Sequence, residues 1–223
     1  MKKSIYLWLI GGATLAAGPM VYAGETGGVS VELKTGTLGG GVELNYAVSP
    51  KFTVGLGLNK FTRSFSDTTD DIDYDVDLDL QSIALLANFH PFEGAFRITA
   101  GVMSNGNELN MTATPTTDTQ IGDNPIPYTP AQIGTLKGTV DFNATAPYLG
   151  LGWGKSSEKG FGLTLDIGVL FQGAPNVSFT ASGTAASNST FQDNLKQEEA
   201  NAEDDIKGFT AYPVVSLGLN YRF

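Results

Sequence analysis

The stretch FGLTLDIGVLF, residues 161–171, decides the fold class of this chain. Its apolar residues stand at every second position: Phe161, Leu163, Leu165, Ile167, Val169 and Phe171. Side chains of a β-strand point alternately to its two faces, whereas an amphipathic helix needs an apolar period near 3.6. The stretch is therefore predicted to be a strand with one apolar face.

The same alternation recurs along most of the chain. Strands are expected at residues 28–36, 38–48, 52–66, 72–90, 95–113, 137–153, 160–180 and 207–223. Short connections at 49–51, 91–94 and 154–159 alternate with longer polar ones at 66–73, 114–136 and 181–206. This organisation predicts an all-β fold, an eight-stranded antiparallel transmembrane β-barrel with short periplasmic turns and longer extracellular loops. The number of strands is even only if the first hairpin, with its turn placed at 35–37, is present. A single strand over residues 29–48 would make the number odd.

A soluble β-sandwich is the alternative fold, and three patterns favour the barrel. Glycines such as Gly55, Gly57 and Gly168 share the non-apolar face, where a narrow lumen is crowded. Aromatic residues gather at strand ends, as they do at membrane interfaces. The last strand ends at Phe223, and Tyr221 with Phe223 resembles the C-terminal membrane assembly signal of outer-membrane barrels.

Composition excludes several classes of function. The chain has 223 residues, 13 Lys and Arg against 23 Asp and Glu, a net charge of −10 and no cysteine. Nucleic-acid binding needs clustered basic residues, so nucleic acid is excluded as a partner. Disulfides and thiolate chemistry require cysteine, so they are excluded as well.

The first 23 residues have the pattern of a secretory signal peptide. Lys2 and Lys3 precede an apolar run, and Val21-Tyr22-Ala23 supplies a small-residue cleavage site. A membrane anchor is the alternative, but the apolar run is short. Residues 1–23 are therefore predicted to be cleaved, and residues 24–223 to form one barrel domain exported to the bacterial outer membrane.

Several short motifs resemble one family of small outer-membrane barrels. They are KTGTLGGG at 34–41, YDVDLD at 74–79, APYLGLGW at 146–153, GAPNV at 173–177 and LGLNYRF at 217–223. Together they are similar to the CarO-type porins, which are associated with carbapenem susceptibility and with uptake of ornithine and other basic amino acids. The resemblance implies an eight-stranded barrel and a route for basic amino acids. The chain departs from the family pattern in its terminal residue pair and its long loops.

The most distinctive candidate site is an acidic ladder, defined as Asp71, Asp73, Asp75, Asp77 and Asp79. These carboxylates share one face of a strand next to an external loop. One hypothesis is an electrostatic funnel that concentrates small cationic solutes. The alternative is a solvated strand extension without a ligand. A calcium loop is less favoured, because a central glycine and a closing glutamate are lacking.

Four charged residues are expected to point into the lumen: Glu43, Arg97, Asp166 and Arg222. An arginine facing lipid at mid-depth costs about 2–4 kcal/mol, so inward placement is favoured. These charges either form a lumen-filling network of ion pairs or line a narrow polar path. An eight-stranded lumen is just wide enough to be filled by side chains, which favours the network.

The sequence does not predict an enzyme, a cofactor or a metal site. His90 is the only histidine, and it precedes Pro91 at an expected periplasmic turn, away from the external rim. The expected partners are outer-membrane lipid and lipopolysaccharide, the barrel assembly machinery and small cationic solutes. The predicted function is a narrow channel for small cationic solutes such as basic amino acids. The alternative is a closed structural or surface-interaction barrel without transport. The long loops at 114–136 and 181–206 are the candidate contact regions.

Overall fold

The computed structural model describes residues 27–69, 72–154 and 159–223. The predicted signal peptide and Asp71 lie outside these residues. The strands in the described part are β1 (Val29–Gly36), β2 (Gly39–Ser49), β3 (Phe52–Thr69), β4 (Ile72–Phe89), β5 (Phe96–Asn105), β6 (Glu108–Pro115), β7 (Leu136–Asp141), β8 (Thr145–Trp153), β9 (Gly160–Leu170), β10 (Asn176–Ala181) and β11 (Tyr212–Arg222). The helices are α1 (Pro130–Ile133) and α2 (Ser189–Ile206).

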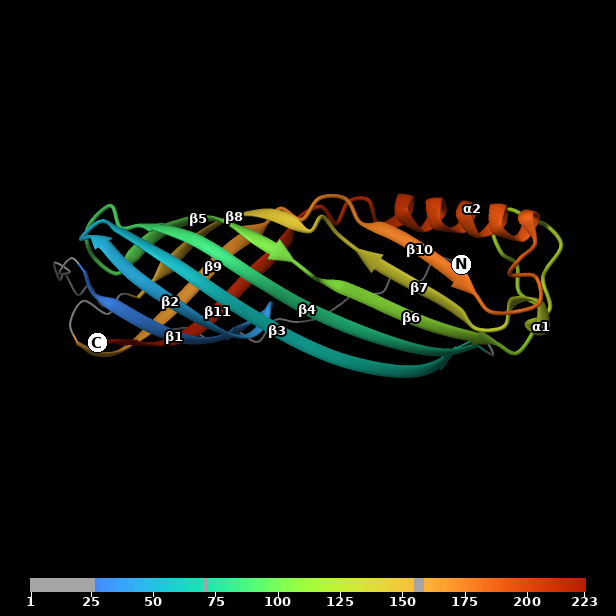
Figure 1. The fold of residues 1–223 in the computed structure, drawn as a ribbon, viewed down its shortest axis with the longest axis horizontal. Helices are drawn as coiled ribbons and strands as arrows, with labels where there is room; N and C mark the ends of the chain where they lie inside the picture. The colour runs from blue at the N-terminus through green and yellow to red at the C-terminus, as the bar shows by residue number, and fades with distance from the viewer. Residues whose placement is uncertain (1–26, 70–71, 155–158) are drawn as a thin grey trace.

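Eight strands close into a ring in the order β1, β2, β3, β4, β5, β8, β9 and β11 (Figure 1). All neighbours in this ring are antiparallel. The last strand closes the ring on the first, from Ser30↔Arg222 to Gly36↔Ser216. The expected eight-stranded antiparallel barrel is confirmed. The first hairpin is also present, with Thr37 and Leu38 as its two-residue turn.

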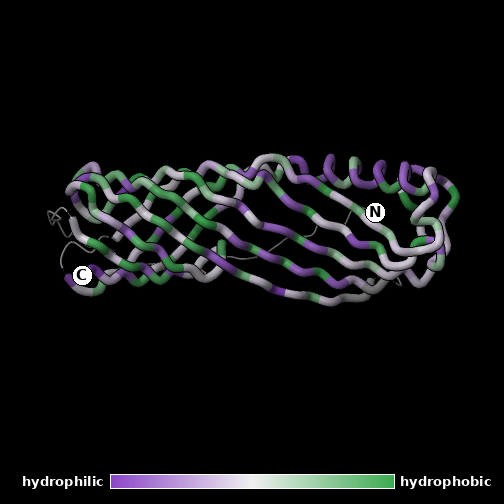
Figure 2. The backbone as a smooth tube through the Cα atoms, in the orientation of Figure 1, coloured by the Kyte–Doolittle hydropathy of each residue, from purple (hydrophilic) through white to green (hydrophobic). Residues whose placement is uncertain are grey.

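The barrel is apolar outside, and its charged side chains point inside. On β2, Leu44 is 50% exposed whereas the neighbouring Glu43 is 4% exposed. Figure 2 shows green apolar positions recurring along the barrel strands, while α2 is largely purple. This distribution is the one expected when the outside of a barrel contacts lipid and all backbone groups pair between strands.

Aromatic pairs lie at the end of the barrel where β3 begins and β4 ends. The C-terminus lies at the same end (Figure 1). The ring centroids are 4.9 Å apart in Phe52–Phe89, 5.6 Å in Phe96–Trp153 and 4.9 Å in Phe161–Tyr221. Such aromatic girdles mark the level where lipid meets water. The polar turns beyond them therefore lie outside the apolar band.

At the opposite end, the barrel wall continues as an extension sheet, defined as the outer halves of β3 and β4 together with β6, β7 and β10. β4 belongs to both parts: its residues 82–89 pair with β5, and its residues 72–79 pair with β6. β7 then pairs with β6, and β10 pairs with β7. The extension is thus a direct continuation of the barrel backbone.

The sequence-based strands differ from the structure at this junction. The strands expected at 95–113, 137–153 and 160–180 are each divided in two, because one half pairs within the ring and the other within the extension sheet. The long connection expected at 66–73 is also wrong, since β3 reaches Thr69 and β4 begins at Ile72.

The connection expected as a loop at 181–206 contains α2. Asn188 caps this helix, and its Oδ1 accepts a hydrogen bond from the Phe191 backbone N–H at 3.2 Å. Phe191 and Leu195, one turn apart, are buried in a cluster that includes Phe179 of β10. Neither helix of the described residues is long and apolar enough to cross a membrane.

Candidate functional site

The four charged residues expected in the lumen all lie on the inward face of the barrel. Glu43, Arg97 and Arg222 are buried, and the side chain of Asp166 is 13% exposed. They come from β2, β5, β11 and β9, so strands far apart in the sequence bring them together. We call them, together with Glu32 and Lys34 described below, the lumen network.

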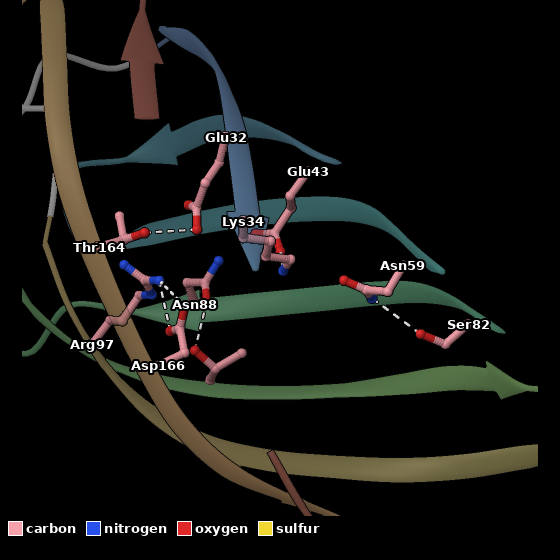
Figure 3. Close-up of polar contacts among 10 residues, drawn as sticks. Glu32, Lys34, Glu43, Asn59, Ser82, Asn88, Arg97, Thr164 and Asp166 are labelled. Atoms are coloured by element: carbon pink, nitrogen blue, oxygen red, sulfur yellow. Dashed lines mark hydrogen bonds and ion pairs between the residues drawn. The ribbon is translucent and has the colours of Figure 1, made fainter. Parts of the chain in front are cut away.

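Arg97 and Asp166 form an ion pair with two hydrogen bonds (Figure 3). Arg97 Nη2 donates hydrogen bonds to both carboxylate oxygens of Asp166, at 2.7 and 2.8 Å. Arg97 Nη1 also donates to the carbonyl oxygen of Gly154 at 2.7 Å. A methyl group at Gly152, between the two side chains, would collide with both of them. The glycine therefore makes the space that this ion pair needs.

Two further charged residues lie in the lumen that sequence reasoning did not select. Lys34 forms an ion pair with Glu43, and Glu32 is 2% exposed. The Thr164 hydroxyl donates to Glu32 Oε1 at 2.7 Å (Figure 3). The sequence could have predicted their inward placement, because Glu32 and Lys34 alternate with the apolar Val31 and Leu33 on β1.

An apolar layer lies in the lumen between the lumen network and the extension sheet. Its buried residues are Leu38, Ala84, Leu86, Met103, Ala146, Tyr148, Leu170 and Val214. Farther toward the extension sheet, Asn59 Nδ2 donates to the Ser82 hydroxyl at 3.0 Å (Figure 3). Layers of ion pairs, apolar side chains and amides therefore fill the lumen in turn.

The space left in the lumen is small. One cavity of about 50 Å³ is lined by residues such as Glu32, Glu43 and Arg222, and a second of about 30 Å³ by residues such as Lys34 and Tyr148. A cavity needs roughly 10–15 Å³ of such volume to hold one water molecule, so each of the two accommodates a few waters. Neither is large enough for an amino acid.

The described side chains of the acidic ladder, those of Asp75, Asp77 and Asp79, lie on the outer face of the extension sheet. Asp73, Asp75, Asp77 and Asp79 occupy alternate positions of β4, and the pairing of β4 with β3 continues without a shift into the barrel. Asp79 therefore shares its face with Ile83 and Leu85, which are exposed on the outside of the barrel. The ladder continues the barrel exterior and not the lumen wall.

Hydroxyl groups of β3 contact the ladder. The Thr62 hydroxyl donates to Asp79 Oδ1 and the Ser66 hydroxyl donates to Asp75 Oδ1, both at 2.7 Å. No three His, Asp or Glu side chains of the described residues are grouped so as to hold a metal ion. Asp75, Asp77 and Asp79 thus form a polar row on a continuous sheet.

The remaining sequence candidates lie near the short connections. His90 is buried directly after β4, and its Nδ1 is 3.2 Å from the Gly94 carbonyl oxygen. The rings of Tyr221 and Phe223 are 5.1 Å apart at the end of the last strand. The Phe223 backbone N–H donates to Val29 O at 3.1 Å, so the terminal residue contributes to ring closure.

Comparison with known proteins relates this geometry to solved barrels. No protein-family model matches the sequence, and no curated protein matches it significantly. The crystal structure of Acinetobacter baumannii CarO2 matches with a TM-score of 0.58 and 23% identity, over 89% of this chain and 100% of that one. The crystal structure of Acinetobacter baumannii CarO matches with a TM-score of 0.55 and 22% identity, over 88% and 98%. The chain therefore has the fold of the CarO barrels, as the sequence motifs led us to expect.

Proposed function

We propose that this chain is an outer-membrane barrel with a closed lumen, which acts through its folded extension on the external side of the membrane. The apolar exterior and the aromatic girdle support the membrane location. The main observation that supports a closed barrel is the filled lumen, with its Arg97–Asp166 pair, its apolar layer and its cavities of about 50 and 30 Å³.

The first prediction concerns ion conductance. Purified mature protein, inserted into planar bilayers, is expected to give no steady single-channel conductance, because an ion would have to cross the apolar layer. Flotation of labelled protein with lipid vesicles establishes insertion independently, and an open general porin in the same bilayers calibrates detection. Reproducible conductance steps from folded protein would contradict the closed barrel.

A second candidate function is a narrow route for cationic solutes such as basic amino acids. The acidic ladder supports it, because a row of carboxylates raises the local concentration of cations. The route also requires the lumen network and the apolar layer to rearrange, since the lumen cavities are too small for these solutes.

The same bilayers separate the two functions. A channel predicts cation-selective conductance that falls when Asp73, Asp75, Asp77 and Asp79 are replaced by Asn. The effect of the replacement should shrink from 0.1 M to 1 M salt, as the Debye length falls from about 10 Å to about 3 Å. The closed barrel predicts no conductance from either protein.

A further inference from the structure

The extension sheet carries a polar groove of about 440 Å³ on its outer face. All five strands contribute to its lining, with Thr62 on β3, Asp79 on β4, Asn110 on β6, Lys137 and Thr139 on β7 and Ser178 on β10. We call this cavity the outer groove. Its lining consists mainly of hydroxyl, amide and carboxylate groups on paired strands, so the groove is built on a rigid support.

One row of polar side chains crosses the outer groove from strand to strand. Asp77 pairs with Asn110, Asn110 with Thr139, and Thr139 with Ser178. Neighbouring strands lie about 4.8 Å apart, so these donors and acceptors follow at that spacing. The Thr139 hydroxyl donates to Asn110 Oδ1 at 2.8 Å, which fixes both groups within the row.

The outer face changes chemistry in layers along the strands. On the outer face, Leu58, Ile83 and Val102 are the last exposed apolar residues of β3, β4 and β5. Lys60 stands next in the outward series on β3 and is exposed, with Gln81 opposite it on β4. Asp79, at the rim of the outer groove, is four residues from Ile83, about 13 Å along the strand. From the barrel toward the extension sheet, the outer face therefore presents an apolar level, a level with the cationic Lys60 and a hydroxyl-rich level.

This layering matches the order of groups in a glycolipid of a membrane leaflet. Acyl chains contact apolar side chains, phosphates bind a lysine ammonium, and sugar hydroxyls hydrogen-bond to carboxylates, amides and hydroxyls. The outer groove lies on the face that contacts lipid below it, so headgroups are the molecules brought to it. A lumen solute does not reach this face by way of the barrel interior.

We propose that the outer groove binds the sugar headgroup of an outer-leaflet glycolipid of the lipopolysaccharide type, whose acyl chains lie against the barrel exterior. The proposal rests on the proposed outer-membrane location. Asp77 and Asp79 accept hydrogen bonds from sugar hydroxyls, Thr139 and Ser178 both donate and accept, and Lys60 faces the phosphate level.

The test measures glycolipid binding to the mature protein in lipid nanodiscs. Native mass spectrometry compares discs of phosphatidylcholine alone with discs that also contain rough lipopolysaccharide. The double variant Thr139→Leu/Ser178→Leu removes two hydroxyls and fills the groove, and it is expected to weaken binding by about tenfold. The matched control Ser66→Leu/Thr114→Leu makes the same kind of change on the same sheet face, outside the groove lining, and should bind like the wild type.

Equal binding by the groove variant and the wild type, with both proteins folded by heat-modifiability, overturns the proposal. Equal affinity for the deacylated core oligosaccharide and for intact lipopolysaccharide also overturns it, in favour of a soluble saccharide ligand. Flotation of the wild type with vesicles is measured separately. A protein that floats but does not bind glycolipid defeats only the groove, whereas a protein that does not float defeats the outer-membrane location.

Discussion

At the scale of single residues, the lumen network depends on the pairing of buried charges. A buried ion without a partner is costly, so Asp166 and Arg97 stabilise the barrel only as a pair. Period-two alternation predicted the inward placement of both residues from the sequence. The pairing of each acid with its base could not be predicted, because it depends on the order of the strands around the ring. Arg97 and Asp166 are close because only β8 lies between β5 and β9. The Lys34–Glu43 pair likewise depends on the register of the first hairpin.

The residue-scale prediction compares two aspartates. Asp166→Ala should lower the free energy of unfolding by about 3–5 kcal/mol, because Arg97 remains buried without its carboxylate. Asp204→Ala removes an equivalent contact, to Lys207, from a side chain that is 76% exposed. An exposed pair of this kind contributes about 0–1 kcal/mol. Urea unfolding in detergent micelles measures both variants, and similar losses would contradict a structural role of the buried pair.

At the scale of secondary-structure elements, α2 protects the open edge of the extension sheet. β10 is the last strand on its side of the sheet, so its outward N–H groups have no neighbouring strand among the described residues. Glu199 Oε1 accepts from Phe179 N–H at 2.6 Å, and Glu203 Oε1 accepts from Val177 N–H at 3.0 Å. The helix thereby blocks pairing with another chain, which an exposed edge invites.

Helix α2 was not predicted from the sequence. Residues 189–206 are rich in Gln, Asn and acidic residues, so their composition indicates a solvated loop. Only Phe191 and Leu195 are buried, which is too few to give a clear helical period. The Asn188 cap and the spacing of those two residues were the available signals. The bonds from Glu199 and Glu203 to another element depend on tertiary packing alone.

The element-scale prediction removes the two edge contacts. Glu199→Ala/Glu203→Ala should speed hydrogen exchange at the Val177 and Phe179 amides by about tenfold each, because each loses its protein acceptor. Asp204→Ala/Asp205→Ala, in the same helix, removes the same charge but neither contact, and exchange at these two amides should not change. Equal exchange rates in the two double variants would contradict edge protection by α2.

At the scale of the whole molecule, the alternating pattern predicted the barrel but not the extension sheet. Alternation continues from β5 into β6 with the same inward positions, since both strands keep one register against β4. Nothing in such a pattern marks the point where a strand changes its neighbour. The glycine face, the aromatic ends and the even strand count were predictable, because each follows from closing a sheet within a membrane.

The whole-molecule prediction concerns closure of the ring. Phe223→Ala should lower the yield of folded barrel in the outer membrane several-fold, because the terminal aromatic residue lies at the edge of the strand that closes the sheet. Phe209→Ala changes a similarly exposed phenylalanine outside the strands and should assemble normally. Heat-modifiability of the outer-membrane fraction on gels measures the folded yield. Equal yields from the two variants would argue against a terminal assembly signal.

The hairpin of β3 and β4 joins the barrel to the tip of the extension sheet without interruption. The two strands have 18 residues each and stay in register from Phe52↔Phe89 to Thr69↔Ile72, a length of roughly 60 Å. A pull on the tip along the strands is carried by β3 and β4 together, and it loads in shear the backbone bonds that join them to β2 and β5, so that many bonds resist at once. The hairpin therefore transmits tension from the extension sheet directly into the wall of the barrel.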